Sequence, residues 1–279
     1  MREILRAEIL SIGSELTTGE TRDTNSGEIA GWLTNEGVEV LRMTALPDDL
    51  DVVRDVLTMA FERSDLVVTT GGLGPTPDDL TRESIAAAIG ESPTADPALV
   101  AWLRGLFERR GLSFPEVNLK QAWVTPSTTV IPNANGSAPG WWIDRPDGRV
   151  IVALPGPPRE MRPMWTDWVL PRLKARGLGQ ALASVTLRTS GIGESLIAER
   201  LAGLLDRAAN PTVATYARAD GVDIRISAVP TSIAASELVA LTETKVQSLV
   251  GQHVWGHGGD TWPSIVGAAL RARGWRLAI

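Results

Sequence analysis

Apolar runs with the composition of buried strands alternate with helical segments along this chain as far as Thr70. The strand-like runs are Ala7–Gly13, Val38–Leu46 and Asp65–Thr70. Between them, apolar side chains recur at helical spacing in Asn25–Gly37 and Pro47–Ser64. Strands that alternate with helices in this way lie parallel in one sheet and are joined by right-handed crossovers. The order therefore predicts an α/β fold.

The rest of the chain extends this pattern and then changes it. Further helices are expected over Asp79–Ile89, Pro97–Arg110 and 157–176, with a strand over Arg149–Leu154. We therefore predict a three-layer α/β/α domain with a mostly parallel sheet over residues 1–176. After a glycine-containing linker, Arg176–Gln180, a strand, a helix over 193–208, a hairpin that turns at Ala219–Gly221 and a closing helix predict a second, smaller α+β domain over 177–250.

Composition excludes several classes of function. The chain has no cysteine, which rules out disulfides, thiolate nucleophiles and cysteine metal sites. A net charge of −6 without a long basic run argues against a nucleic-acid partner. No apolar run approaches the ~20 residues that span a bilayer, so we expect a cytoplasmic protein with no membrane partner. The two histidines, His253 and His257, lie among glycines, which favours a linker loop over a metal-binding pair on a helix.

The strongest candidate for a ligand site is the stretch that follows the third strand, TTGGLGPTPDD. Ligands of open α/β sheets bind at the carboxyl ends of the strands. Gly71, Gly72 and Gly74 let backbone N–H groups of 71–74 approach a phosphate closely. Asp78 and Asp79 then follow as ligands for a divalent metal ion or as groups that orient a water molecule.

A purely structural interpretation competes for part of this stretch. Thr76 could be the N-cap of the next helix, with Pro77 at its first position and Asp78 and Asp79 in its first turn. Capping accounts for those four residues without a ligand. It does not account for three glycines at the end of a strand, so we favour the ligand site.

Other polar and glycine-rich turns are expected at the same edge of the sheet. Glu15 and Asn25 follow the first strand, and Asp48 follows the second, although each could be an ordinary loop or cap residue. Two later loops resemble the first in design, and each is weak by itself. Their candidate residues are Gly136 and Gly140 in NANGSAPG, and Pro155, Gly156 and Glu160 in VALPGPPRE.

Taken together, these motifs are similar to those of a known family. The first domain carries GSELTTG, the Asp23–Asn25 step, PDD at 47–49, TTGGLGPTPDDLT at 69–81, NGSAPG at 135–140 and LPGPPREM at 154–161. The second carries GIGES, PTVATYA and VDIRISA in the same order. The chain thus resembles the competence/damage-inducible (CinA) family, whose first domain is similar to the molybdopterin-binding domain of MoaB and MogA and is followed by a middle domain.

The resemblance implies a metal-dependent nucleotide pyrophosphatase that hydrolyses ADP-ribose to AMP and ribose 5-phosphate, acting as a homodimer. It implies that Asp79 and Asp48 are catalytic and that Mg²⁺, Mn²⁺ or Co²⁺ is held by Asp48, Asp78, Asp79 and Glu15. The expected substrate-binding residues are Gly71, Gly72, Gly74, Thr76, Asn25, Gly136, Gly140, Pro155, Gly156 and Glu160. The alternatives are a molybdopterin- or nucleotide-binding module without turnover and a structural half that supports dimerisation.

Two departures from the family pattern narrow these expectations. Molybdopterin binders usually have threonine in the glycine turn where this chain has Leu73, which argues against cofactor synthesis. Residues 251–279 resemble a linker and the truncated start of the family's C-terminal deamidase domain, with WRLAI at 275–279 as a strand. The chain contains no cysteine for the catalytic loop of that domain, so we expect no deamidation of nicotinamide mononucleotide.

Overall fold

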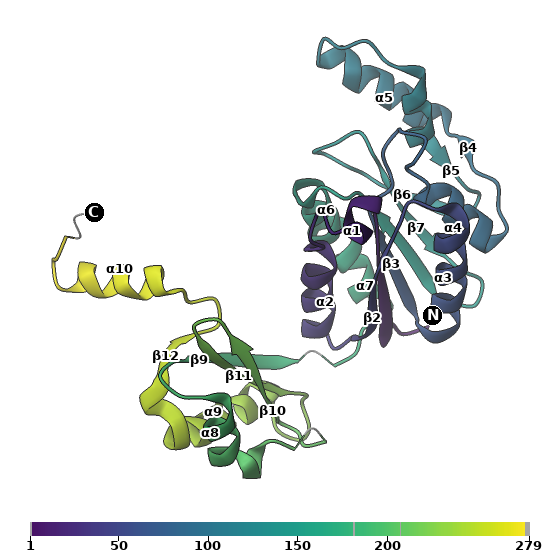
Figure 1. Ribbon diagram of the computed structural model, residues 1–279. Coiled ribbons are helices and arrows are strands. Elements are labelled where there is room, and N and C mark those ends of the chain that lie inside the picture. Colours follow the sequence, from purple (N-terminus) through teal and green to yellow (C-terminus); the bar gives the residue numbers. More distant parts are fainter. Residues whose placement is uncertain (1, 181, 207, 277–279) are drawn as a thin grey trace. The chain divides into compact units, whose positions relative to one another are not determined.

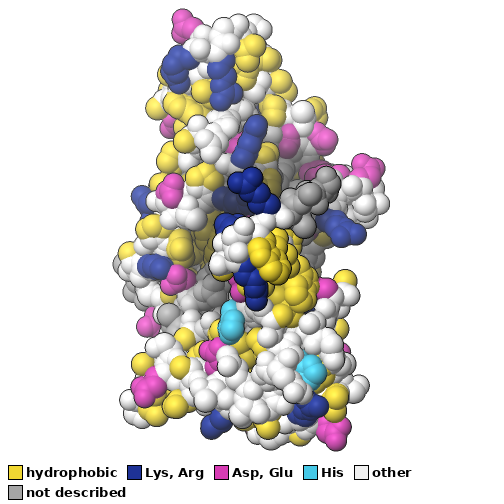
Figure 2. All heavy atoms as spheres, turned by 90° about the vertical axis from the view of Figure 1, so that its left-hand side faces the viewer, with side chains coloured by type: hydrophobic (Ala, Val, Ile, Leu, Met, Phe, Trp, Pro, Cys, Tyr) yellow, Lys and Arg dark blue, Asp and Glu magenta, His cyan; other side chains and the backbone are white. Residues whose placement is uncertain are grey.

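The computed structural model describes residues 2–180, 182–206 and 208–276 (Figure 1). The chain divides into two compact units between Gly179 and Gln180. No helix within the described ranges has both the length and the apolar composition needed to cross a membrane. On the face drawn in Figure 2, basic and acidic side chains are interspersed with hydrophobic ones.

A six-stranded sheet forms the centre of the first unit, with the order β2-β1-β3-β8-β7-β6. The four parallel strands are β2 (Glu39–Leu46), β1 (Arg6–Ile12), β3 (Leu66–Thr70) and β8 (Val150–Leu154). The antiparallel additions are β7 (Gly140–Asp144) and β6 (Thr128–Ile131). The mostly parallel α/β class predicted from the sequence is confirmed.

Helices cover both faces of this sheet (Figure 1). Successive strand residues point to opposite faces, so Ile9 and Val68 belong to one buried core while Leu10 and Val67 belong to the other. The first core is closed by α2 (Asn25–Asn35), α6 (Pro158–Met164) and α7 (Leu170–Arg176). The second is closed by α3 (Leu50–Arg63) and α4 (Thr81–Ile89). Burial on both faces explains why the strands read as continuous apolar runs.

Smaller elements lie between the main ones. A short α1 (Ser14–Thr17) follows β1, and α5 (Pro97–Arg109) precedes a 3₁₀ segment over Glu116–Ala122. A two-stranded ribbon joins β4 (Thr94–Ala95) to β5 (Trp123–Val124). The single helix expected over 157–176 is interrupted by a π-helical segment, Trp165–Val169. Pro171 lies just beyond it and has no N–H to donate, which disturbs the regular α-helical bonding.

The second unit contains a four-stranded sheet with the order β10-β11-β9-β12. Its first three strands are β9 (Ala183–Thr189), β10 (Thr212–Arg218) and β11 (Gly221–Ala228). One face packs against α8 (Glu194–Arg200) and α9 (Ala235–Val250). The helix expected over 193–208 is shorter, because a separate 3₁₀ turn follows over Ala202–Leu204.

The prediction of a loop around the two histidines is wrong. Val254–His257 forms β12, which pairs antiparallel with β9, so the sheet continues past the boundary predicted at residue 250. His253 lies on a 3₁₀ turn and His257 on the strand, not on one helix. After Gly258, α10 (Trp262–Ala272) begins with a capping box between Thr261 and Ser264. Of the strand expected over 275–279, residues 277–279 lie outside the described residues, and Trp275 and Arg276 are not in a strand.

One glycine fixes the exit of the central strand. The N–H of Gly71 donates to the Leu154 carbonyl at 3.0 Å, and its backbone has φ of +97°. A Cβ atom at this position would lie 2.0 Å from the Ile12 carbonyl oxygen. Only glycine therefore lets the chain leave β3 in close contact with the ends of β1 and β8.

We predict that Gly71→Ala will lower the free energy of unfolding by about 2–5 kcal/mol. Left-handed strain contributes about 1–2 kcal/mol and overpacking about 1–3 kcal/mol. Gly90→Ala is the matched control, because Gly90 has φ of +73° with nothing within 4 Å of the added Cβ. That variant should lose only the strain, about 1 kcal/mol. Urea unfolding followed by tryptophan fluorescence measures both, and equal losses would contradict the close contact.

Candidate functional site

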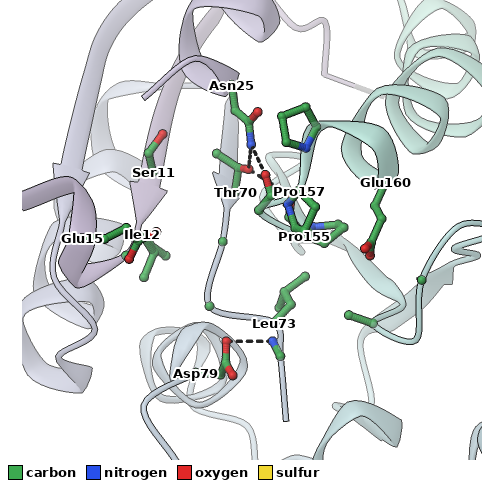
Figure 3. Close-up of a pocket in the computed structure, with 18 of the residues that line it drawn as sticks. Ser11, Ile12, Glu15, Asn25, Thr70, Leu73, Asp79, Pro155, Pro157 and Glu160 are labelled. Atoms are coloured by element: carbon green, nitrogen blue, oxygen red, sulfur yellow. Dashed lines mark hydrogen bonds between the residues drawn. The ribbon is translucent and has the colours of Figure 1, made fainter. Parts of the chain in front are cut away.

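A pocket of about 1080 Å³ opens at the carboxyl edge of the first unit's sheet. The ends of β1 and β3 line it together with the turn after β8, the start of α2 and further loops (Figure 3). This is the edge where open α/β folds bind ligands, and the volume is at the upper end of the usual range for small-molecule sites. A dinucleotide is therefore within its capacity.

Most of the residues that the sequence singled out meet in this pocket. The predicted residues that line it are Glu15, Asn25, Asp48, Gly71, Gly72, Gly74, Asp78, Asp79, Gly136, Pro155, Gly156 and Glu160. Two predicted residues are not among its lining. Gly140 is buried in β7, where a Cβ would lie 2.5 Å from the Ala153 carbonyl oxygen, and the Thr76 hydroxyl is bonded to Asp79. Gly140 and Thr76 therefore support neighbouring parts of the fold and do not line the pocket.

The glycine turn offers fewer backbone donors than the sequence predicted. Gly71 donates its N–H to Leu154, and Gly74 donates to Asp79 Oδ1 at 2.8 Å. Among the described residues, the amides of Gly72 and Leu73 have no acceptor. We expected all the amides of 71–74 to bind phosphate, and the structure leaves these two for a ligand.

The capping interpretation of Asp79 is wrong, because α4 begins later, at Thr81. Asp79 Oδ1 accepts the bond from Gly74, while Oδ2 accepts the Thr76 amide at 2.9 Å and the Thr76 hydroxyl. The aspartate side chain thus organises the loop before the helix instead of capping the helix, in competition with helical bonding. Asp78, its neighbour, is exposed at the pocket rim.

Asp48 and Glu15 flank a second turn, at the end of β1. Asp48 Oδ2 accepts the Ser14 N–H at 2.7 Å, and the Ser14 hydroxyl accepts the Asp48 N–H at 3.2 Å. The Glu15 carboxylate lies against Gly13, where a Cβ would be 2.6 Å from Oε1. Both carboxylates line the pocket.

This pair of carboxylates fits one kind of metal site. No group of three histidine or acidic side chains that could hold a metal is present in the described part of the chain. Mg²⁺ at phosphate sites needs only one or two protein carboxylates, because substrate oxygens and water complete its coordination. Asp48 and Glu15 provide that donor set, whereas both oxygens of Asp79 already accept hydrogen bonds from its own loop.

Asn25 connects three of the walls (Figure 3). Its amide nitrogen, at the start of α2, donates to the Thr70 hydroxyl at 2.8 Å and to the Gly156 carbonyl at 2.7 Å. These bonds hold α2 against the end of β3 and against the turn after β8. The amide oxygen is buried without a partner among the described residues.

Glu160 supports the loop on the other side of the pocket. It is 8% exposed and accepts a hydrogen bond from Asn133 Nδ2 at 2.8 Å. The same Asn133 nitrogen donates to the Ala138 carbonyl, and a Cβ at Gly136 would lie 1.9 Å from Glu160 Oε2. Gly136 is therefore required for the loop to pack against this carboxylate.

Sequence reasoning missed the basic residues of the site. Lys120 pairs with Glu83 at 2.7 Å and donates to the Thr76 carbonyl, and Arg82 is completely buried beneath the glycine turn. An available signal was that Arg82 shares the helical spacing of the buried residues Ile85 and Ala86. Three further arginines line the pocket: Arg22, Arg110 and Arg159.

The charge of the pocket lining is acidic. Six carboxylates face three arginines, which leaves a formal charge of −3 on the lining. The carboxylates are Glu15, Asp23, Asp48, Asp78, Asp79 and Glu160. A phosphate-bearing ligand would be repelled by this lining unless a cation accompanied it or lay close to it.

We predict that Asp79→Asn will lower the free energy of unfolding by about 1–3 kcal/mol. The new asparagine has an N–H₂ group in place of one carboxylate oxygen, so one backbone N–H of the loop would face a donor and lose its acceptor. Asp78→Asn is the neighbouring control and should stay within about 0.5 kcal/mol, as is usual for an exposed side chain. Chemical denaturation of both variants measures the difference. Equal stability of the two would show that the Asp79 bonds contribute nothing to the loop.

Two family models match the chain, one on each unit. Residues 8–175 match the model described as "Probable molybdopterin binding domain". Residues 184–256 match "Damage-inducible protein CinA KH domain". The second match extends into β12, in agreement with the place of that strand in the sheet of the second unit.

Two relatives match both units together, and a solved structure matches part of the chain. A CinA-like protein from Deinococcus deserti is 49% identical over 271 residues, which are 97% of this chain and 67% of the relative. A putative competence-damage inducible protein from Clostridium kluyveri is 37% identical over 276 residues, again with 67% of its length covered. A solved structure, "CinA with unknown function" from Thermoplasma acidophilum, is 36% identical with a TM-score of 0.55, and the match covers 60% of this chain and 98% of that chain. The chain belongs to the CinA family.

Proposed function

We propose that this protein is a metal-dependent nucleotide pyrophosphatase that hydrolyses ADP-ribose to AMP and ribose 5-phosphate. One observation carries the proposal. Two turn amides, at Gly72 and Leu73, have no acceptor among the described residues and share a pocket of dinucleotide size with the carboxylates of Asp48 and Glu15. Amides of this kind bind phosphate oxygens, and carboxylates bind the cation that accompanies a diphosphate.

Asp48 and Glu15 would hold a divalent ion, Mg²⁺, Mn²⁺ or Co²⁺, together with the substrate phosphates. Bound there, such an ion polarises a phosphoryl oxygen and lowers the pKa of a coordinated water molecule. The acidic lining supports this assignment, since a formal charge of −3 does not attract a diphosphate by itself. Asp78, exposed at the rim, is retained as a secondary candidate for the ion.

The chain's own groups would position the reaction. The amides of Gly72 and Leu73 would donate to phosphate oxygens, and Asp79 Oδ1 keeps one acceptor position beside its bond from Gly74. That position would orient the attacking water. Water adds its oxygen to one phosphorus, and the bond from that phosphorus to the bridging oxygen breaks. The bridging oxygen leaves with the second phosphate, and the two protons of the water pass to the products or to solvent.

We propose that the reaction takes place in the cytoplasm, as expected from the composition, and in a homodimer, as the resemblance to the family implied. Of the other predicted residues of the lining, Gly136, Pro155, Gly156 and Glu160 would contact the substrate, and Glu160 would also keep the loop of Gly136 in place. Asn25 would act by holding α2 against β3, since its amide nitrogen is already bonded within the protein.

We predict that the purified protein will release AMP and ribose 5-phosphate from ADP-ribose when Mg²⁺, Mn²⁺ or Co²⁺ is added, as measured by chromatography of the products. Asp48→Asn should lower kcat/KM roughly 100-fold, since loss of an ion ligand removes several kcal/mol of transition-state stabilisation. Asp51→Asn is the control, because Asp51 is an exposed acid of α3 that pairs with Arg54 and does not line the pocket. Its activity should be unchanged.

Two outcomes would contradict the proposal. The first is the absence of AMP with all three ions, and the second is full turnover by Asp48→Asn. A thermal-shift measurement with ADP-ribose separates the first outcome from a binding module. Ligand at 100 times its dissociation constant adds about 2.7 kcal/mol of stability whether or not it is hydrolysed.

A further inference from the structure

Arg82 is the most unusual charged residue of the first unit. It lies in the first turn of α4, and it is 0% exposed. No carboxylate lies within 4 Å of its guanidinium among the residues that the structure describes. Buried cations normally pair with an acid because the desolvation of an ion is costly. The hydrogen bonds that Arg82 makes in place of an ion pair therefore indicate the role of its charge.

The guanidinium bonds instead to two loops of the pocket. Nη1 donates to the Leu73 carbonyl at 2.8 Å, within the glycine turn. Nη2 donates to the Pro139 carbonyl at 3.1 Å, at the end of the loop that Glu160 supports. One buried side chain thus joins the loops on either side of the ligand space.

The bond to Leu73 continues through a single peptide group. The carbonyl of Leu73 and the N–H of Gly74 belong to the same peptide unit, and that N–H donates to Asp79 Oδ1 at 2.8 Å (Figure 3). A donor on the carbonyl polarises the peptide and strengthens the bond that its N–H makes. The buried guanidinium of Arg82 is therefore connected to the Asp79 carboxylate through one peptide group, without direct contact between the two side chains.

The charge persists at neutral pH. Burial lowers the pKa of Arg82 to about 10, and the nearby Glu83 and Asp79 oppose this shift. The protein therefore keeps a positive charge under a pocket whose lining is acidic. In a buried setting this field is weakly screened, and it acts on any ligand that rests on the turn.

We propose that Arg82 is a positioning residue for phosphate-bearing nucleotides. It orients Asp79 through the Leu73–Gly74 peptide, and its charge makes the glycine turn favour a phosphate over an uncharged group. The identity of the nucleotide rests on the function proposed above. The dependence of binding on phosphate charge does not rest on that function, because it follows from the position of the guanidinium beneath the turn.

The test compares three ligands by isothermal titration, with and without Mg²⁺. Adenosine carries no phosphate, whereas AMP and ADP-ribose carry the charge that Arg82 is expected to attract. Arg82→Met should weaken AMP and ADP-ribose at least tenfold and adenosine less than threefold. Arg149→Met is the matched control, because Arg149 bonds the Ser64 carbonyl at 3.1 Å near the start of β8, at the opposite end of that strand from the pocket. It should leave all three affinities within twofold of the wild type.

Arg82→Lys separates the charge from the geometry. Lysine keeps a positive charge but cannot reach both carbonyls with a planar fork. Its affinity for ADP-ribose should recover to within threefold of the wild type. Its kcat for ADP-ribose should remain about tenfold lower, because the bond chain to Asp79 is incomplete.

Some results would overturn the proposal. Equal loss of adenosine and ADP-ribose affinity in Arg82→Met would show a purely structural role. If that variant does not fold, an Arg82→Lys protein that loses all phosphate selectivity overturns the role of the charge. Failure of the wild type to bind AMP or ADP-ribose would also overturn the proposal. If instead the wild type binds these ligands with the expected dependence on Arg82 but releases no AMP, the proposed hydrolysis is wrong and the role of Arg82 stands.

Discussion

The site of this protein depends on the contact between the glycine turn and the ends of the central strands. Gly71 leaves β3 with its amide on the Leu154 carbonyl and its Cα against the Ile12 carbonyl. Its own carbonyl accepts the Thr81 hydroxyl at 2.8 Å, which brings the start of α4 against the turn. Three strands and a helix therefore meet at one residue that has no side chain.

Several polar side chains around the junction hold neighbouring loops and helices in place through hydrogen bonds. Asp79 holds the loop before α4, Asn25 holds α2, and Glu160 holds the loop before β7. Each is a residue of the pocket lining, and each makes hydrogen bonds within the protein. Such bonds fix side chains without a ligand, which reduces the reorganisation required when a substrate binds. The groups left for a ligand include two turn amides, the carboxylates of Asp48, Glu15 and Asp78, one acceptor position of Asp79 and the exposed arginines of the rim.

Charge in this pocket is arranged in layers. The lining is acidic, while the guanidinium of Arg82 lies behind the turn and is excluded from solvent. Carboxylates at the surface favour a cation, and a buried positive charge favours the phosphate that such a cation accompanies. The two preferences are compatible only for a ligand that brings both signs together. A nucleotide diphosphate with a divalent ion has that property, whereas a free nucleoside does not.

Local sequence determined the elements, because the alternation of apolar periods specifies strands and helices before any tertiary contact forms. It predicted β1, β2, β3 and β8 within a residue or two, and the carboxyl edge where the candidate residues meet. Where a short segment had several possible partners, tertiary structure decided. Val254–His257 became a strand only because the edge of β9 was available for pairing. Asp79 could cap a helix or accept from its loop, and Arg82 could face solvent or the core. Those choices depend on which groups lie nearby in space, and no local pattern contains that information.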